Sequence, residues 1–191
     1  MTNGPLPPVL EDYRRQIETL KARARTLADR LTRAQMGARP APEAWSPVEI
    51  LDHLRRTVEQ YLPAIDAALA RAEKTASPPG EPNYGWVWRL FLRTLEPPIR
   101  QRFRAPKAFA PAENPDVDAT LAGFLAAHDA LIKRIHRAAD YDLERVKVVS
   151  PANSLLKPPL GCALLAMAAH GRRHFSQLPP LPGAELPGER G

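Results

Sequence analysis

The chain has 191 residues, a net charge of +6 and a pI near 9.8, and 6% of its residues are aromatic. This length suits one domain with a sizeable core. The many Ala, Leu and Arg residues and the few β-branched ones favour helices, so we expect an all-α protein. The basic residues are not interleaved with aromatic residues in one patch, which argues against nucleic-acid binding.

Membrane and disulfide-linked classes of protein do not fit the sequence. The single cysteine, Cys162, allows no internal disulfide. The longest apolar run, residues 160–169, is about half as long as a bilayer span requires. The N-terminus has no basic region followed by an apolar run. We therefore expect a cytoplasmic protein with no membrane partner.

The first predicted helix covers residues 9–35 and follows a Pro-rich stretch, residues 1–8, that we expect to be disordered. Its apolar residues recur at helical spacing, with charged residues on the opposite face. Gly37 and Pro40 end the pattern. The apolar positions are Leu10, Tyr13, Ile17, Leu20, Ala24, Leu27 and Leu31.

The start of the second predicted helix is marked by a capping box. Ser46 can cap the helix, Pro47 suits its first position, and Glu49 can reach back to the Ser46 amide. This start places His53 in the second turn, on the apolar face. Pro63 falls later in the same helix and predicts a kink or a break there.

The middle of the chain is predicted to be mostly connection. Residues 76–84 form a loop by composition, and residues 96–116 form a long Pro-rich connection. Between them, residues 85–95 are apolar enough to be buried, and we interpret them as one short extra helix. A strand is the alternative for this segment, because Trp, Val and Phe favour strands.

Two more long helices complete the predicted fold. The third begins at residues 116–118 and carries His128 on its apolar face, and the fourth covers residues 160–178. The last residues, 179–191, lack apolar periodicity and are predicted to be a disordered tail. The sequence thus predicts a four-helix bundle with long Pro-rich connections, in a single domain that covers residues 9–178.

Three histidines on apolar faces point to a metal site. His170 and His174 are four residues apart, which is about 6 Å of helix rise, so both face the same side of the fourth helix. His53 lies in a similar apolar setting on the second helix. Inward histidines on facing helices can share one ion. His128 is a lone histidine, and a hydrogen-bonded core residue is the simpler interpretation of it.

With these segments placed, the chain resembles the DinB/YfiT-like family of metalloenzymes. The likeness rests on the W-S-P-x-E-I-L-x-H-L start of the second helix and on the H-x-x-x-H-x-x-Q end of the fourth. The residues concerned are Trp45, Ser46, Pro47, Glu49, Ile50, Leu51, His53 and Leu54 in the first motif, and His170, His174 and Gln177 in the second. The resemblance implies a four-helix bundle whose ligands for a divalent metal, nickel or zinc, are His53, His170 and His174.

The resemblance also implies what such a metal does. Relatives include transferases that use bacillithiol, mycothiol or glutathione, a maleylpyruvate isomerase, and hydrolases. We therefore expect a metal-dependent enzyme that acts on a small molecule, either as an S-transferase with a low-molecular-weight thiol or as a hydrolase. The resemblance further implies a homodimer, for which residues 86–95 are the candidate interface. No catalytic residue beyond the metal ligands is identified.

One departure from the family pattern keeps an alternative open. Relatives often have an acidic residue between the paired histidines, where this chain has Gly171, Arg172 and Arg173. A local carboxylate base is therefore missing from the motif. The alternative is a non-catalytic helical bundle that binds a metal or a small ligand, with a role in stress among its functions. Candidate partners for the histidine rings are Glu49, Asp52, His128 and Gln177 on position alone.

Overall fold

The computed structural model describes residues 5–75, 79–98 and 106–178. Every regular element in these ranges is a helix, which confirms the predicted all-α class. The four long helices are α1 (Pro8–Arg30), α3 (Pro47–Arg71), α5 (Val117–Ala138) and α6 (Leu160–Phe175). The short ones are α2 (Arg33–Gly37), α4 (Gly85–Thr94) and the 3-10 helix η1 (Lys107–Phe109). The expected tail 179–191 and the first four residues lie outside the described ranges.

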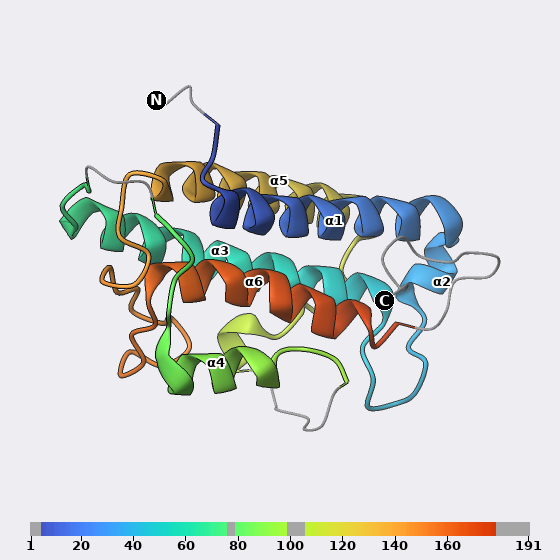
Figure 1. Ribbon diagram of the computed structural model, residues 1–191. Coiled ribbons are helices and arrows are strands. Elements are labelled where there is room, and N and C mark those ends of the chain that lie inside the picture. The colour runs from blue at the N-terminus through green and yellow to red at the C-terminus, as the bar shows by residue number, and fades with distance from the viewer. Residues whose placement is uncertain (1–4, 76–78, 99–105, 179–191) are drawn as a thin grey trace.

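The four long helices form a bundle in which each packs against two neighbours. α5 contacts α1 and α3 on one side, and α6 contacts the same two helices on the other. Figure 1 shows that α1 and α6 run in one direction while α3 and α5 run in the other. Because α3 and α5 are parallel, the chain between them must return along the bundle, and this return contains α4 and η1. As a result, α3 begins at the end of the bundle where α6 finishes.

The bundle core is apolar and continuous. The first helix contributes a stripe of residues at the predicted spacing, and all but one of the seven predicted positions are buried; Leu31 is partly exposed. The largest fully buried side chains are Phe124, Leu10, Ile17, Leu20, Met36, Ile50, Leu51, Ile65, Leu69, Leu131, Ile135 and Leu143. Each such aliphatic or aromatic side chain stabilises the fold by about 1.5–3 kcal/mol relative to exposure. No helix in the described ranges is both long and apolar enough to cross a bilayer.

Two predicted helix details need correction. The single helix predicted for residues 9–35 is interrupted after Arg30, because Thr32 starts α2 with a capping box of its own. Its side chain accepts from the Gln35 amide, and the Gln35 side chain accepts from the Thr32 amide. Conversely, the alternative of a break at Pro63 is wrong, because α3 passes through this residue. The alternative of a kink there stays a prediction. The predicted Ser46 capping box is present and fixes the start of α3.

The short helix predicted between the loops is α4, but the prediction that it is buried was wrong. None of its residues is buried, and Trp86 is 72% exposed. The physical reason is its place in the fold: α4 lies outside the four long helices and packs along α6. Before it, the buried Tyr84 donates to or accepts from Tyr13 of α1. Beyond it, Glu96 pairs with Arg172 of α6.

Candidate metal centre

The three histidines predicted as ligands lie together at one end of the bundle. His53 is in the second turn of α3, and His170 and His174 are on successive turns near the end of α6. Because these two helix ends meet, one ring nitrogen from each histidine lies within 4.8 Å of the other two. His53 and His174 are buried, and His170 is partly exposed. Two members of the cluster are thus buried in the core, and the third lies where the core meets the surface.

The ring geometry suits a shared ligand. The Nε2 atoms of His53 and His170 are 2.9 Å apart. The ring centroids of the three pairs are 4.5, 4.6 and 5.1 Å apart, and the rings meet edge to face. Three nitrogens bonded to one tetrahedral zinc ion at about 2.0 Å would be about 3.3 Å from one another. Small side-chain adjustments would bring the three nitrogens to that spacing.

Outer hydrogen bonds determine which nitrogen of two of the rings is free. The Nδ1–H of His53 donates to the backbone carbonyl of Phe109 at 2.7 Å. The Nδ1–H of His174 donates to Oε1 of Gln177 at 2.8 Å. A carbonyl oxygen only accepts, so in each ring Nδ1 carries the proton and Nε2 keeps its lone pair. This is the arrangement by which proteins orient metal-binding histidines.

The same logic explains the contact between His53 and His170. Since Nε2 of His53 has a lone pair, the Nε2–H of His170 is the donor in their 2.9 Å hydrogen bond. An ion bound at this point would take the place of the shared proton. The chemistry of the donor set thus fits a metal. Among the described residues the cluster contains nitrogen donors only, with no carboxylate or thiolate.

Burial keeps all three imidazoles neutral. Burial lowers the pKa of His53, and burial together with the nearby His53 lowers the pKa of His174 to about 3. The pKa of His170 lies well below its ordinary value because of burial and the neighbouring histidines. A neutral imidazole is the form that binds a metal ion. The cluster is therefore in the ligand-competent protonation state at neutral pH.

The residues between the paired histidines connect α6 to its neighbours. Gly171 faces Leu20 of α1, where an added Cβ would meet the Leu20 side chain at 2.3 Å. Arg172 pairs with Glu96, just beyond α4, and Arg173 donates to the Thr94 carbonyl at 2.7 Å. These three residues thus have packing and anchoring contacts of their own. The segment between the paired histidines therefore connects α6 to α1 and to the end of α4.

The predicted partners of the histidine rings are only partly correct. Gln177 holds His174 as expected. Glu49 instead binds the Ser46 amide and Arg39. Asp52 binds two arginines and a loop amide rather than a histidine.

The predicted core position of His128 is correct. It is 1% exposed, and its Nδ1–H donates to the Phe124 carbonyl at 2.8 Å on α5, away from the cluster.

Two neighbours of the cluster were not identified as partners from the sequence. The Trp45 ring stacks on His174 at 5.8 Å between centroids and lies 4.7 Å from His53. A signal for it existed, because Trp45 directly precedes the capping box. The Phe109 carbonyl had no such signal, since any residue can supply a backbone oxygen. It comes from η1, within the connection that was predicted only as a long loop.

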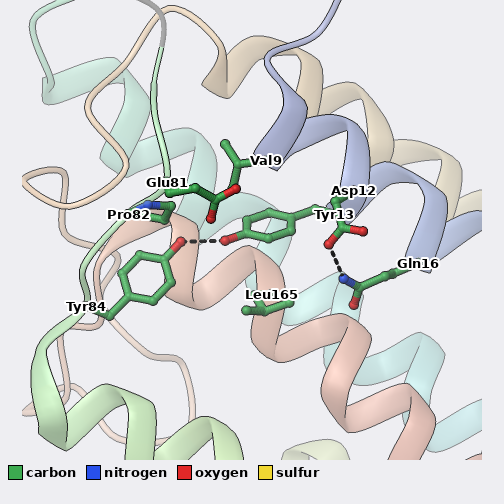
Figure 2. Close-up of a pocket in the computed structure, with 8 residues that line it drawn as sticks. All are labelled: Val9, Asp12, Tyr13, Gln16, Glu81, Pro82, Tyr84 and Leu165. Carbon is green, nitrogen blue, oxygen red and sulfur yellow. Dashed lines mark hydrogen bonds between the residues drawn. The ribbon is translucent and has the colours of Figure 1, made fainter. Parts of the chain in front are cut away.

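A pocket of about 290 Å³ lies between α1, α6 and the segment before α4 (Figure 2). At its wall the hydroxyls of Tyr13 and Tyr84 form a 2.7 Å hydrogen bond. Burial raises the pKa of Tyr13 to about 12 and also raises that of Tyr84, so both phenols are protonated at neutral pH. None of the three clustered histidines lines this pocket. It is therefore separate from the candidate metal centre.

The fold and the cluster define an all-α bundle with a three-histidine site that could hold a metal ion. The comparison with known families agrees with this class. Residues 16–178 match the DinB superfamily, and the chain belongs to that superfamily. No curated protein and no solved structure matches the chain.

Proposed function

We propose that this protein is a metal-dependent enzyme that holds one divalent ion, zinc or nickel, with His53, His170 and His174. The observation that carries the proposal is the orientation of the cluster. Two rings are fixed through Nδ1, so that their Nε2 lone pairs are free for a shared ion, and all three rings are neutral. Three neutral protein ligands are typical of catalytic sites, because structural zinc sites use four.

The chemistry proposed for the site follows from this ligand set. An ion with three imidazole ligands keeps a position open, where it lowers the pKa of a bound water or thiol and so serves hydrolysis or thiol transfer. The chain's own part is to hold the rings and to admit a small-molecule substrate. His170 is the partly exposed member of the cluster, while the Trp45 ring packs against His53 and His174.

Cys162 is not a second nucleophile. It is fully buried, and burial raises the pKa of its thiol to about 12.

A non-catalytic metal- or ligand-binding bundle is the second candidate. It is favoured by the absence of a carboxylate from the cluster within the described residues, because no side-chain base is then at hand to accept a proton. The two candidates differ in turnover. Metal-loaded protein that hydrolyses model esters or amides, or transfers bacillithiol, mycothiol or glutathione to an electrophile, is an enzyme. Metal-loaded protein that does neither is a binder.

The first test is metal content, measured by mass spectrometry on tag-free protein after zinc or nickel reconstitution. We expect about one ion per chain in the wild type and strong loss in His53→Ala and His174→Ala. The loss of metal affinity behind it should exceed the roughly 10–100-fold that removing an outer hydrogen-bond partner costs. His136→Ala is the matched control, because His136 is an exposed histidine on α5. Equal metal content in all four proteins would contradict the proposed ligands.

We also propose that the protein forms a homodimer through the exposed face of α4. Trp86, Leu90 and Val87 are 72%, 55% and 51% exposed, and an apolar helix face of this kind is stabilised when another chain covers it. We expect a dimeric mass by light scattering and a monomeric mass for Trp86→Glu. Leu155→Glu is the control, because Leu155 is 87% exposed but lies outside α4. A monomeric wild type would refute the proposal.

A further inference from the structure

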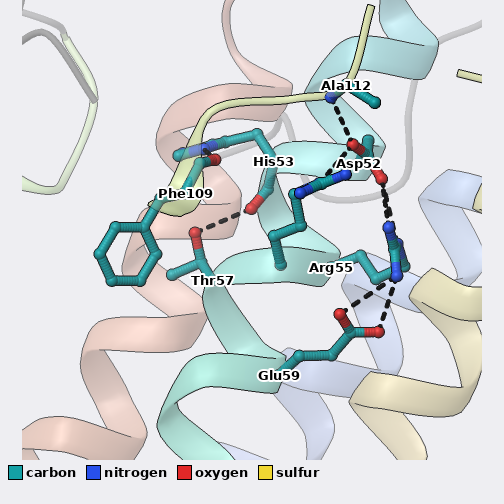
Figure 3. Close-up of polar contacts among 8 residues, drawn as sticks. Asp52, His53, Arg55, Thr57, Glu59, Phe109 and Ala112 are labelled. Carbon is teal, nitrogen blue, oxygen red and sulfur yellow. Dashed lines mark hydrogen bonds and ion pairs between the residues drawn. The ribbon is translucent and has the colours of Figure 1, made fainter. Parts of the chain in front are cut away.

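Two adjacent residues of α3 hold the same loop at two points (Figure 3). The Nδ1–H of His53 donates to the carbonyl of Phe109 at 2.7 Å, and the amide of Ala112 donates to Oδ2 of Asp52 at 2.8 Å. The loop is the stretch from η1 to Ala112, more than fifty residues further along the chain. The position of the Phe109 carbonyl, which selects the His53 tautomer, is thus linked to Asp52.

The carboxylate of Asp52 is buried and fully engaged. Its exposed fraction is 1%. Oδ1 accepts from Nη2 of Arg55 at 2.6 Å, and Oδ2 accepts from Nε of Arg56 at 2.7 Å as well as from the Ala112 amide. A buried carboxylate is costly unless it is paired and hydrogen-bonded. Here two guanidinium groups balance its charge, which leaves it available as a rigid acceptor for the loop.

Arg55 is itself held from two further sides. It pairs with Glu59 one turn along α3 at 2.9 Å. Its aliphatic part lies against α5 at Gly123, where an added Cβ would come within 2.6 Å of the Arg55 Cδ atom. The arginine therefore has little freedom to move, and the carboxylate that it contacts is fixed with it.

We propose that Asp52 is a positioning residue for the histidine cluster. By holding the Ala112 amide, it keeps the Phe109 carbonyl against His53, so that the ring stays in its Nδ1–H tautomer with Nε2 turned toward His170. A free neutral imidazole populates both tautomers, and only one of them presents Nε2 as a ligand. The consequence for metal affinity rests on the proposed function, whereas the consequence for the tautomer does not.

The test measures the tautomer and the metal affinity separately. Ring ¹⁵N chemical shifts of His53 in the metal-free protein report which nitrogen carries the proton, and competition with a chelator gives the zinc dissociation constant. In the wild type we expect the Nδ1–H tautomer. In Asp52→Ala we expect a mixture of tautomers and a zinc dissociation constant raised roughly 10–100-fold, the usual effect of losing an outer partner.

Two further variants make the test specific. Asp66→Ala removes another carboxylate of α3, one that pairs with Arg134 and Arg137 of α5 instead of holding the loop, and it should leave both readouts unchanged. Ala112→Pro removes the amide donor while Asp52 keeps both arginines, and it should reproduce the tautomer mixture. It decides the question if Asp52→Ala does not fold.

An unchanged His53 tautomer in a folded Asp52→Ala or Ala112→Pro protein would overturn the positioning role. A wild type that shows the expected tautomer but binds no zinc would overturn only the metal proposal.

Discussion

Replacement of Gly171 by alanine tests the close contact between α1 and α6 beside the cluster. A Cβ at this position would lie 2.3 Å from Cδ1, 3.0 Å from Cδ2 and 3.2 Å from Cγ of Leu20. Rotating one methyl group does not clear such an overlap, because the branch point of the side chain is also too close. Leu20 is 1% exposed and has no route into solvent. The variant must therefore separate the two helices or push Leu20 into its neighbours.

The expected cost follows from two opposing contributions. Overpacking a well-packed core destabilises a protein by about 1–3 kcal/mol, and this contact is at the upper end because it involves three atoms of a fixed side chain. Alanine inside a helix is about 1 kcal/mol more favourable than glycine. We therefore expect Gly171→Ala to lower the free energy of unfolding by about 2 kcal/mol. If glycine were merely tolerated at this position, the same change would stabilise the protein.

Urea unfolding followed by circular dichroism, on metal-free protein, measures this difference. Gly37→Ala is the control, because Gly37 lies in α2 and nothing lies within 4 Å of a Cβ there; it should leave stability unchanged or raise it by up to about 1 kcal/mol. In a Leu20→Ala background the overlap disappears, so Gly171→Ala should become stabilising by up to about 1 kcal/mol. A stable Gly171→Ala protein, or a penalty that survives in the Leu20→Ala background, would refute the packing argument.

Two further predictions concern the pH dependence of stability and the hydrogen bond between His174 and Gln177. Burial lowers the pKa of His128 to about 4 from 6.5. As the pH falls from about 6.5 toward 4, the His128 ring is therefore protonated in the unfolded chain but not in the folded one. The contribution of His128 to the free energy of unfolding is therefore fully present above about pH 6.5, and it falls by about 3 kcal/mol as the pH falls to about 4. Urea titrations of metal-free protein at pH 7 and 4.5 should show a smaller loss of stability for His128→Gln than for the wild type. An equal loss would contradict the lowered pKa of His128. Gln177→Leu removes the acceptor of His174 and should weaken zinc binding at least about tenfold in a chelator competition. An unchanged affinity would show that this hydrogen bond does not orient the ring.

The sequence predicted the features that depend on local pattern. The Ser46 capping box determined where α3 begins, and therefore which way His53 faces. The spacing of His170 and His174 placed them on one face of α6 in the same way. The end of α1 at Arg30 also depends on local sequence, because Thr32 and Gln35 form a capping box that starts α2. It was missed because the apolar spacing of the first helix continues to Leu31.

The features that the sequence did not predict depend on distant parts of the chain. The exposure of α4 depends on how four other helices fill the core, and an apolar composition does not reveal it. The Phe109 carbonyl is a backbone group in a loop, so no residue type marks it. The partners of Asp52 include the amide of Ala112, sixty residues away. From its position along α3 alone, Asp52 was predicted to contact the histidine rings, which it does not.

The parallel course of α3 and α5 links metal binding to the stability of the fold. It brings His53 next to His170, which is 117 residues away in sequence. An ion bound to both residues would therefore cross-link the chain and close most of it into one loop. Such a ligand set does not exist in the unfolded chain, so metal binding would add to folding stability by mass action, about 2.7 kcal/mol when free metal is 100 times its dissociation constant. The concentration of free metal would then set the fraction of chains that is folded.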